Sequence, residues 1–92
     1  MPYVKQEDRI KLDPLVEALD TIATVGELNY VVTRLSLRFL KRLGLSYSNI
    51  SNVVGTLHLI PVEMTRRLVD AYENNKIEEN GDVLEYKGSF WR

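Results

Sequence analysis

Three arginines recur along one side of the helix that the middle of the sequence predicts. Arg34, Arg38 and Arg42 are spaced at i, i+4 and i+8, which places their guanidinium groups in a row. Such a row can bind phosphate oxygens through charge-assisted hydrogen bonds. The alternative is a solvated flank that pairs with Asp and Glu side chains from the two ends of the chain, and we favour this second interpretation.

Acidic side chains near the C-terminus raise a second kind of chemistry, metal-dependent hydrolysis. All-α nucleotide pyrophosphohydrolases gather carboxylates at i, i+3 and i+4 on facing helices to hold Mg²⁺. The acids of this region are Asp70, Glu73, Glu78, Glu79 and Asp82. Of these, only Asp70 and Glu73 share helical spacing within a well-predicted helix. A metal-dependent nucleotide hydrolase is therefore an alternative function that we do not favour.

The single histidine and the absence of cysteine exclude a thiolate metal site and disfavour catalysis by a histidine pair. His58 alone supplies neither a metal cage nor a catalytic pair, and we expect it at the edge of the apolar core. The sequence also lacks a phosphate loop, an EF-hand pattern and a G-x-G-x-x-G motif. We therefore expect no cofactor and no metal, and we favour a non-catalytic protein over an enzyme.

The segment from Leu43 to Asn52 resembles the turn and second helix of a helix-turn-helix protein. A recognition helix normally carries cations that contact bases or phosphates. No Lys or Arg occurs between Arg42 and Arg66, which disfavours this function. Nucleic-acid binding therefore stands as an alternative to the function that we favour.

Composition and charge limit the class of protein. The 92 residues carry a net charge of −1 and no cysteine, which fits one small domain in a reducing, cytoplasmic environment. No apolar run approaches the length of a membrane span, and we expect no membrane partner. The charge is distributed as −3, +5 and −3 over residues 1–27, 28–69 and 70–92. The basic middle is either an anion-binding surface or a surface that the acidic ends cover.

Two helices are predicted in the first half of the chain. Apolar residues at spacings of four and three predict a helix over residues 14–23, capped by Asp13 with Pro14 in its first turn. A second helix is predicted over residues 25–43, after an N-terminal arm and this first helix. Thr24 and Glu27 have the spacing of a capping box, and Gly44 can end the helix.

A third helix is predicted over residues 47–75, with Pro61 in its interior. The apolar spacing continues across Pro61, so we favour one long kinked helix over two separate helices. Asn80 and Gly81 mark a turn. They either join a short hairpin or end a helix that runs on to Asn80. We expect an irregular or short β tail that packs on the helices.

The helix over residues 25–43 is apolar on two sides. The wedge expected to face the core consists of Leu28, Val31, Val32, Leu35, Phe39 and Leu43. The outer side carries Tyr30, Leu37 and Leu40. A helix of this kind is normally covered on both sides. The second cover is either the chain's own tail, which ends with Phe90 and Trp91, or a second copy, and we favour a homo-oligomer.

Several segments together resemble a family of small bacterial and phage-encoded proteins without an assigned function. These segments are residues 3–9 and 13–15, Gly26-Glu27-Leu28-Asn29-Tyr30 with residues 31–33, Arg66-Arg67-Leu68-Val69, Tyr72-Glu73, and Lys76-Ile77-Glu78-Glu79-Asn80-Gly81-Asp82-Val83. The resemblance implies a compact helical protein. Pro61 departs from the unbroken helix expected in relatives, and residues 84–92 extend beyond the usual end.

These observations predict an all-α protein, a small bundle of about three helices, with one domain over residues 1–83 and an extension over residues 84–92. The expected function is a non-catalytic interaction and oligomerisation module. If a ligand site exists, we expect it among polar residues of the shared segments and the arginine row. These candidate binding residues are Glu27, Asn29, Tyr30, Arg34, Arg38, Arg67, Tyr72, Glu73 and Asn80.

Overall fold

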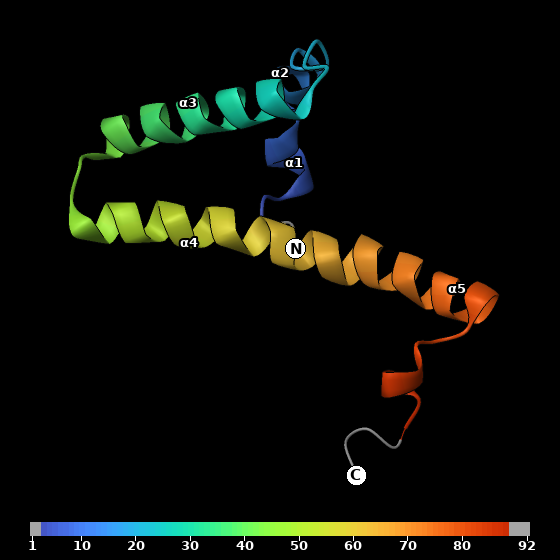
Figure 1. The fold of residues 1–92 in the computed structure, drawn as a ribbon. Helices are drawn as coiled ribbons and strands as arrows, with labels where there is room; N and C mark the ends of the chain where they lie inside the picture. The colour runs from blue at the N-terminus through green and yellow to red at the C-terminus, as the bar shows by residue number, and fades with distance from the viewer. Residues whose placement is uncertain (1–2, 89–92) are drawn as a thin grey trace. The chain divides into compact units, whose positions relative to one another are not determined.

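A computed structural model describes residues 3–88, and helices are the only regular structure within them (Figure 1). In chain order, the elements are α1 (Gln6–Arg9), α2 (Asp13–Glu17), α3 (Val25–Leu43), α4 (Tyr47–Met64), the π-helical segment η1 (Thr65–Val69), α5 (Asp70–Asn80) and the 3₁₀ turn η2 (Leu84–Tyr86). The predicted all-α class is confirmed.

The chain divides into two compact units, Met1–Val54 and Gly55–Arg92. The boundary falls inside α4. The first unit contains α1, α2, α3 and the first two turns of α4, and the second contains the rest of α4 with η1, α5 and η2. The single domain expected over residues 1–83 stays a prediction.

The N-terminal arm is a single helical turn, α1, followed by a first helix that is shorter than predicted. α2 ends at Glu17 instead of residue 23, and the chain continues in turns with i→i+3 hydrogen bonds, such as Ile22 N to Leu19 O at 3.0 Å. Beyond Ala18 and Leu19, the residues Asp20, Thr21 and Ile22 favour a helix interior poorly. The predicted Asp13 cap is also wrong, because Leu12 is the N-cap residue and makes no side-chain cap bond.

The helix α3 has the predicted boundaries. Glu27 N donates to Thr24 Oγ1 at 3.1 Å, and Thr24 N donates back to Glu27 Oε1 at 3.1 Å, which completes the capping box. At the other end, Gly44 has a φ of 107°, a conformation that glycine adopts without a Cβ penalty. Both helix ends are therefore determined by residues within one turn of them.

The turn between α3 and α4 is held by two side chains at the start of α4, those of Ser46 and Asn49. Ser46 Oγ accepts from Asn49 N at 3.1 Å and so caps α4. The Asn49 amide donates from Nδ2 to Gly44 O at 3.0 Å and to Leu43 O at 3.3 Å. These bonds satisfy carbonyls at the end of α3 that have no partner within the helix.

The helical run continues through Pro61 as predicted and ends later than predicted. α4, η1 and α5 follow one another without a break, and the run ends at Asn80 instead of residue 75. Gly81, with a φ of 79°, donates its N–H to Ile77 O at 2.8 Å and closes the helix. The helix-to-Asn80 alternative for the Asn80-Gly81 turn is thus the correct one.

The π-helical segment η1 lies one turn beyond Pro61. Asp70 N donates to Thr65 O, five residues back, so this turn is wider than an α-helical turn.

Among the described residues, one side chain is buried. Leu40 on α3 is 8% exposed, although it was expected on the outer side of that helix. The wedge residues Leu28, Leu35, Phe39 and Leu43 are all about half exposed. Leu40 thus departs from the expected sides of α3, whereas Tyr30 and Leu37 on the outer side are 62% and 60% exposed. His58, expected at the core edge, is exposed on α4.

The described part of the tail forms the 3₁₀ turn η2, and residues 3–88 contain no strand. The irregular tail is thus the alternative that this part of the chain adopts. Phe90 and Trp91, expected to provide apolar cover, lie outside the described residues.

Candidate functional site

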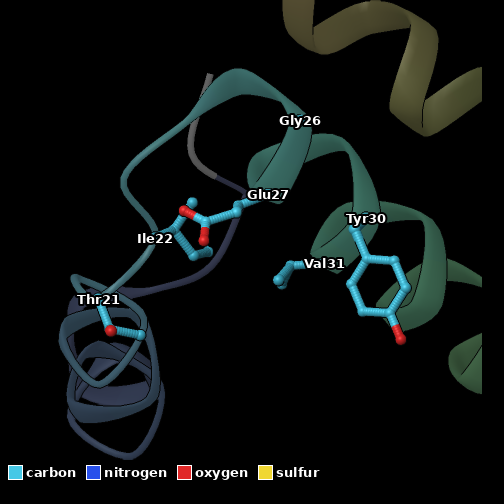
Figure 2. A pocket seen from close by; sticks show the side chains of 6 residues that line it. All are labelled: Thr21, Ile22, Gly26, Glu27, Tyr30 and Val31. Carbon is cyan, nitrogen blue, oxygen red and sulfur yellow. The ribbon is translucent and has the colours of Figure 1, made fainter.

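A shallow pocket lies between the loop before α3 and the first two turns of that helix. Its volume is about 380 Å³, and its lining residues are Thr21, Ile22, Gly26, Glu27, Tyr30 and Val31. Figure 2 shows Glu27 and Val31 on α3 facing the loop that carries Thr21 and Ile22. The pocket brings together Glu27 and Tyr30, two of the nine candidate binding residues.

The carboxylate of Glu27 has a structural role in this pocket. Its Oε1 accepts from Ala23 N at 2.8 Å and from Thr24 N at 3.1 Å. Two backbone donors therefore hold one of its oxygens and fix its orientation. The remaining lining groups are apolar carbon, one phenol and one hydroxyl, and they provide no acid–base pair. The pocket is thus suited to an apolar contact and not to catalysis.

The arginine row runs along α3 beside two aromatic rings. Arg34 Cζ lies 5.9 Å from the centre of the Tyr30 ring, and Arg42 Cζ lies 5.8 Å from the centre of the Phe39 ring. Such cation–π contacts contribute about 0.5–1 kcal/mol at exposed sites. They orient the guanidinium groups but leave their N–H donors available for a further partner.

Within residues 3–88, the structure shows no ion pair for any cation on this side of α3. We call this set the basic flank, and its members are Arg34, Arg38, Lys41 and Arg42. The segment from Leu28 to Leu43 contains no acidic residue that can neutralise them within the helix. The basic flank is therefore a surface with an unbalanced positive charge.

Asn29 and the candidate residues of the second unit make mainly local contacts. Asn29 Oδ1 accepts from Thr33 Oγ1 at 3.2 Å, one turn along α3. Arg67 pairs with Glu63 at 3.2 Å, but the Arg67 side chain is largely exposed, and solvent screens such a pair so that it contributes little to stability. Lys76 Nζ lies 5.5 Å from the Tyr72 ring centre.

The remaining two candidates lie on α5. Glu73 is an exposed carboxylate in its first turn, and Asn80 is its last residue, directly before Gly81. The described residues contain no group of three or more His, Cys, Asp or Glu side chains arranged to hold a metal ion. Glu73 and Asn80 thus have no assigned ligand.

Sequence reasoning missed the side chain that joins the beginning of α4 to the end of α3, which is Asn49. It was noted only as part of a helix-turn-helix-like stretch, yet it donates to two carbonyls across the α3–α4 turn. A usable signal is the Ser46-x-x-Asn49 spacing directly after Gly44, which combines a helix end with a helix start. Within the stretch that suggested DNA recognition, Gly44, Ser46 and Asn49 therefore have structural roles in the α3–α4 turn.

The fold and the surface define a small all-α protein with exposed apolar helix faces and one basic flank. Residues 1–83 match the family model named Domain of unknown function (DUF6899), and the chain belongs to this family. No curated protein and no solved structure matches the chain. The match confirms the expected membership of a family without an assigned function.

No helix in residues 3–88 combines the length and the apolar character needed to cross a bilayer.

Proposed function

We propose that the protein is a non-catalytic interaction module that assembles with further copies of itself through apolar helix faces. One observation carries this proposal. Leu59, Ile60 and Val62 on α4 are 62%, 52% and 54% exposed. Residues one and two positions apart on a helix face different sides, so these three leave α4 apolar around much of its circumference. A helix of this kind belongs in an interior.

The wedge of α3 supports the same proposal. Leu28, Leu35, Phe39 and Leu43 line one side of the helix and are each about half exposed. A contiguous apolar strip on a small protein typically marks an interaction surface. We therefore assign the contact between copies to this wedge and to α4, instead of to the outer side of α3. The buried Leu40 interrupts the exposed apolar residues of the outer side, whereas Leu28, Leu35, Phe39 and Leu43 form an uninterrupted exposed strip.

A second copy is the partner that best fits the charges of this surface. α3 has a basic flank and α5 carries four acids against one Lys, so one chain contains both halves of a complementary pair. Self-complementary surfaces are what a two-fold symmetric dimer requires. In such an assembly, the helices of two copies form the bundle that the sequence predicts.

The test compares substitutions within the proposed contact with one substitution on the outer side of α3. We expect Leu35→Ser, on the wedge, and Leu59→Ser, on α4, to weaken the assembly, because each removes apolar area from the contact. Leu37→Ser is the matched control, since Leu37 is 60% exposed on the outer side of α3. Light scattering after gel filtration gives the mass of each variant. Loss of assembly in Leu37→Ser alone would contradict the wedge contact.

We also infer a cytoplasmic location and a bacterial or phage source. The absence of cysteine supports the first, because proteins of reducing compartments do not rely on disulfides. The segments shared with small bacterial and phage-encoded proteins support the second. Fractionation of cells that express a tagged chain tests the location, and recovery in the membrane or periplasmic fraction would contradict it.

A further inference from the structure

The basic flank of α3 offers two arginines at the spacing of one helical turn. Arg34 and Arg38 are four residues apart and extend from the same side of the helix. Within the described chain, neither forms an ion pair, and Arg34 contacts only an aromatic ring among the interactions seen. These two side chains therefore present several donors in a fixed row to a partner with acceptors at a similar spacing.

α5 carries acceptors at such a spacing. Asp70 and Glu73 are three residues apart, so they lie on the same side of the helix, and both are exposed. In contrast, Glu79 is already paired with Lys76 at 3.1 Å. In the described residues, Asp70 and Glu73 form no ion pair. They are the acidic pair on α5 that best matches Arg34 and Arg38.

Helix lengths favour a second copy as the source of this acidic pair. α3 has 19 residues and is about 28 Å long. α4 and η1 together place about 35 Å of helix between the turn that follows α3 and the start of α5. The helical segment between that turn and Asp70 is thus longer than the whole of α3, the helix that carries Arg34 and Arg38. The α5 of a second copy has no such restriction.

The size of the interface also requires more than α3. A strip about 28 Å long and 10 Å wide covers roughly 300 Å². A stable dimer normally buries about 800 Å² on each partner. A further helix from each copy must therefore contribute, and an acidic helix beside the basic flank adds area and specifies the register.

Building on the self-association proposed above, we propose that Arg34 and Arg38 of one copy pair with Asp70 and Glu73 of a second copy. A two-fold axis then produces two equivalent α3–α5 contacts. The contact determines which surfaces meet and in which direction, while the apolar faces supply most of the affinity.

A charge-swap experiment tests this pairing. The variants are R34E/R38E and D70K/E73K, and each makes both α3–α5 contacts of its homodimer repulsive. We expect each variant alone to dimerise at least about tenfold more weakly than the wild type. In an equimolar mixture, every contact again joins opposite charges, so we expect a one-to-one heterodimer. Native mass spectrometry distinguishes this heterodimer from both homodimers.

Matched controls carry the same changes of charge at other sites. K5E/K11E matches the first variant and D13K/E17K matches the second, and both change residues outside α3 and α5. We expect both controls to dimerise like the wild type. Circular dichroism of every variant verifies that the helices remain folded.

The outcomes separate this pairing from self-association itself. A wild-type chain that stays monomeric overturns both proposals. A dimer that both charge variants leave unchanged overturns the pairing and leaves self-association intact. In a third outcome, each charge variant is less stable alone and does not regain stability on mixing. This outcome would indicate that α5 contacts α3 of the same chain, and it also overturns the pairing between copies.

Discussion

Asn49 donates from its side-chain amide to the carbonyl oxygen of Gly44 at 3.0 Å, and this bond joins the beginning of α4 to the end of α3. The same amide also donates to Leu43 O at 3.3 Å. Because the last carbonyls of a helix have no partner within it, one side chain here satisfies two of them. Gly44 O also accepts from Ser46 N at 3.0 Å, so the Asn49 amide and the backbone together fix the direction in which the chain leaves α3.

Replacement of Asn49 by Ala removes both of these bonds. We expect Asn49→Ala to lower the free energy of unfolding by about 1 kcal/mol, the usual net contribution of such hydrogen bonds. Asn52→Ala is the control, since Asn52 lies on the same helix and is exposed. Urea unfolding at one fixed protein concentration measures both. Equal effects of the two substitutions would show that the bonds of Asn49 do not stabilise the turn.

Two glycines provide a pair of substitutions with opposite expected signs. Gly44 has a φ of 107°, so Gly44→Ala strains the backbone and costs on the order of 1–3 kcal/mol. An added Cβ would meet Asn49 Nδ2 only at 3.9 Å, so the cost is conformational and not steric. Gly55 is inside α4 and a Cβ there meets nothing within 4 Å, so Gly55→Ala stabilises by about 0.5–1 kcal/mol. Thermal unfolding of both variants tests these signs.

The capping box of α3 predicts that the chain loses stability when the Thr24 hydroxyl is removed and keeps it when the hydroxyl is retained. Thr24→Ala removes the acceptor of Glu27 N and costs about 1 kcal/mol. Thr24→Ser retains the hydroxyl, so we expect it to remain close to the wild type. Circular dichroism during urea unfolding measures both variants. If Thr24→Ser destabilises the chain as much as Thr24→Ala, the hydroxyl is not the stabilising group.

Among the described side chains, Leu40 is the one whose truncation we expect to lower the free energy of unfolding most. Its exposure of 8% predicts a loss of about 2 kcal/mol or more for Leu40→Ala, because the substitution leaves a cavity. Leu37→Ala, on an exposed position of the same helix, is expected to cost well below 1 kcal/mol. Unfolding of both variants at matched concentration provides the comparison. Similar losses would mean that Leu40 has no special packing role.

The sequence predicts the features of this fold that local chemistry determines. Thr24, Glu27 and Gly44 are within a turn of the ends of α3, and its boundaries are correct for that reason. The helix after Pro14 was predicted too long, because a short apolar spacing does not outweigh the low helix preference of Asp, Thr and Ile. The wider turn at η1 leaves no signal in the apolar spacing.

The candidate site was also predictable only where it depends on residues close together in the sequence. The capping role of Glu27 follows from its distance to Thr24 along the chain, and the structure confirms it. Which side of α3 is covered depends on contacts between distant residues, and the burial of Leu40 could not be read from helical spacing. The binding role of the nine candidate residues stays a prediction.

Self-association is the central claim, and sedimentation equilibrium of the unmodified chain tests it most directly. A single chain has a mass of 10.6 kDa. Over a range from low to high micromolar concentration, we expect the average mass to rise towards at least twice that value, because mass action favours the assembled state. An average mass that stays at 10.6 kDa over the whole range would contradict the claim.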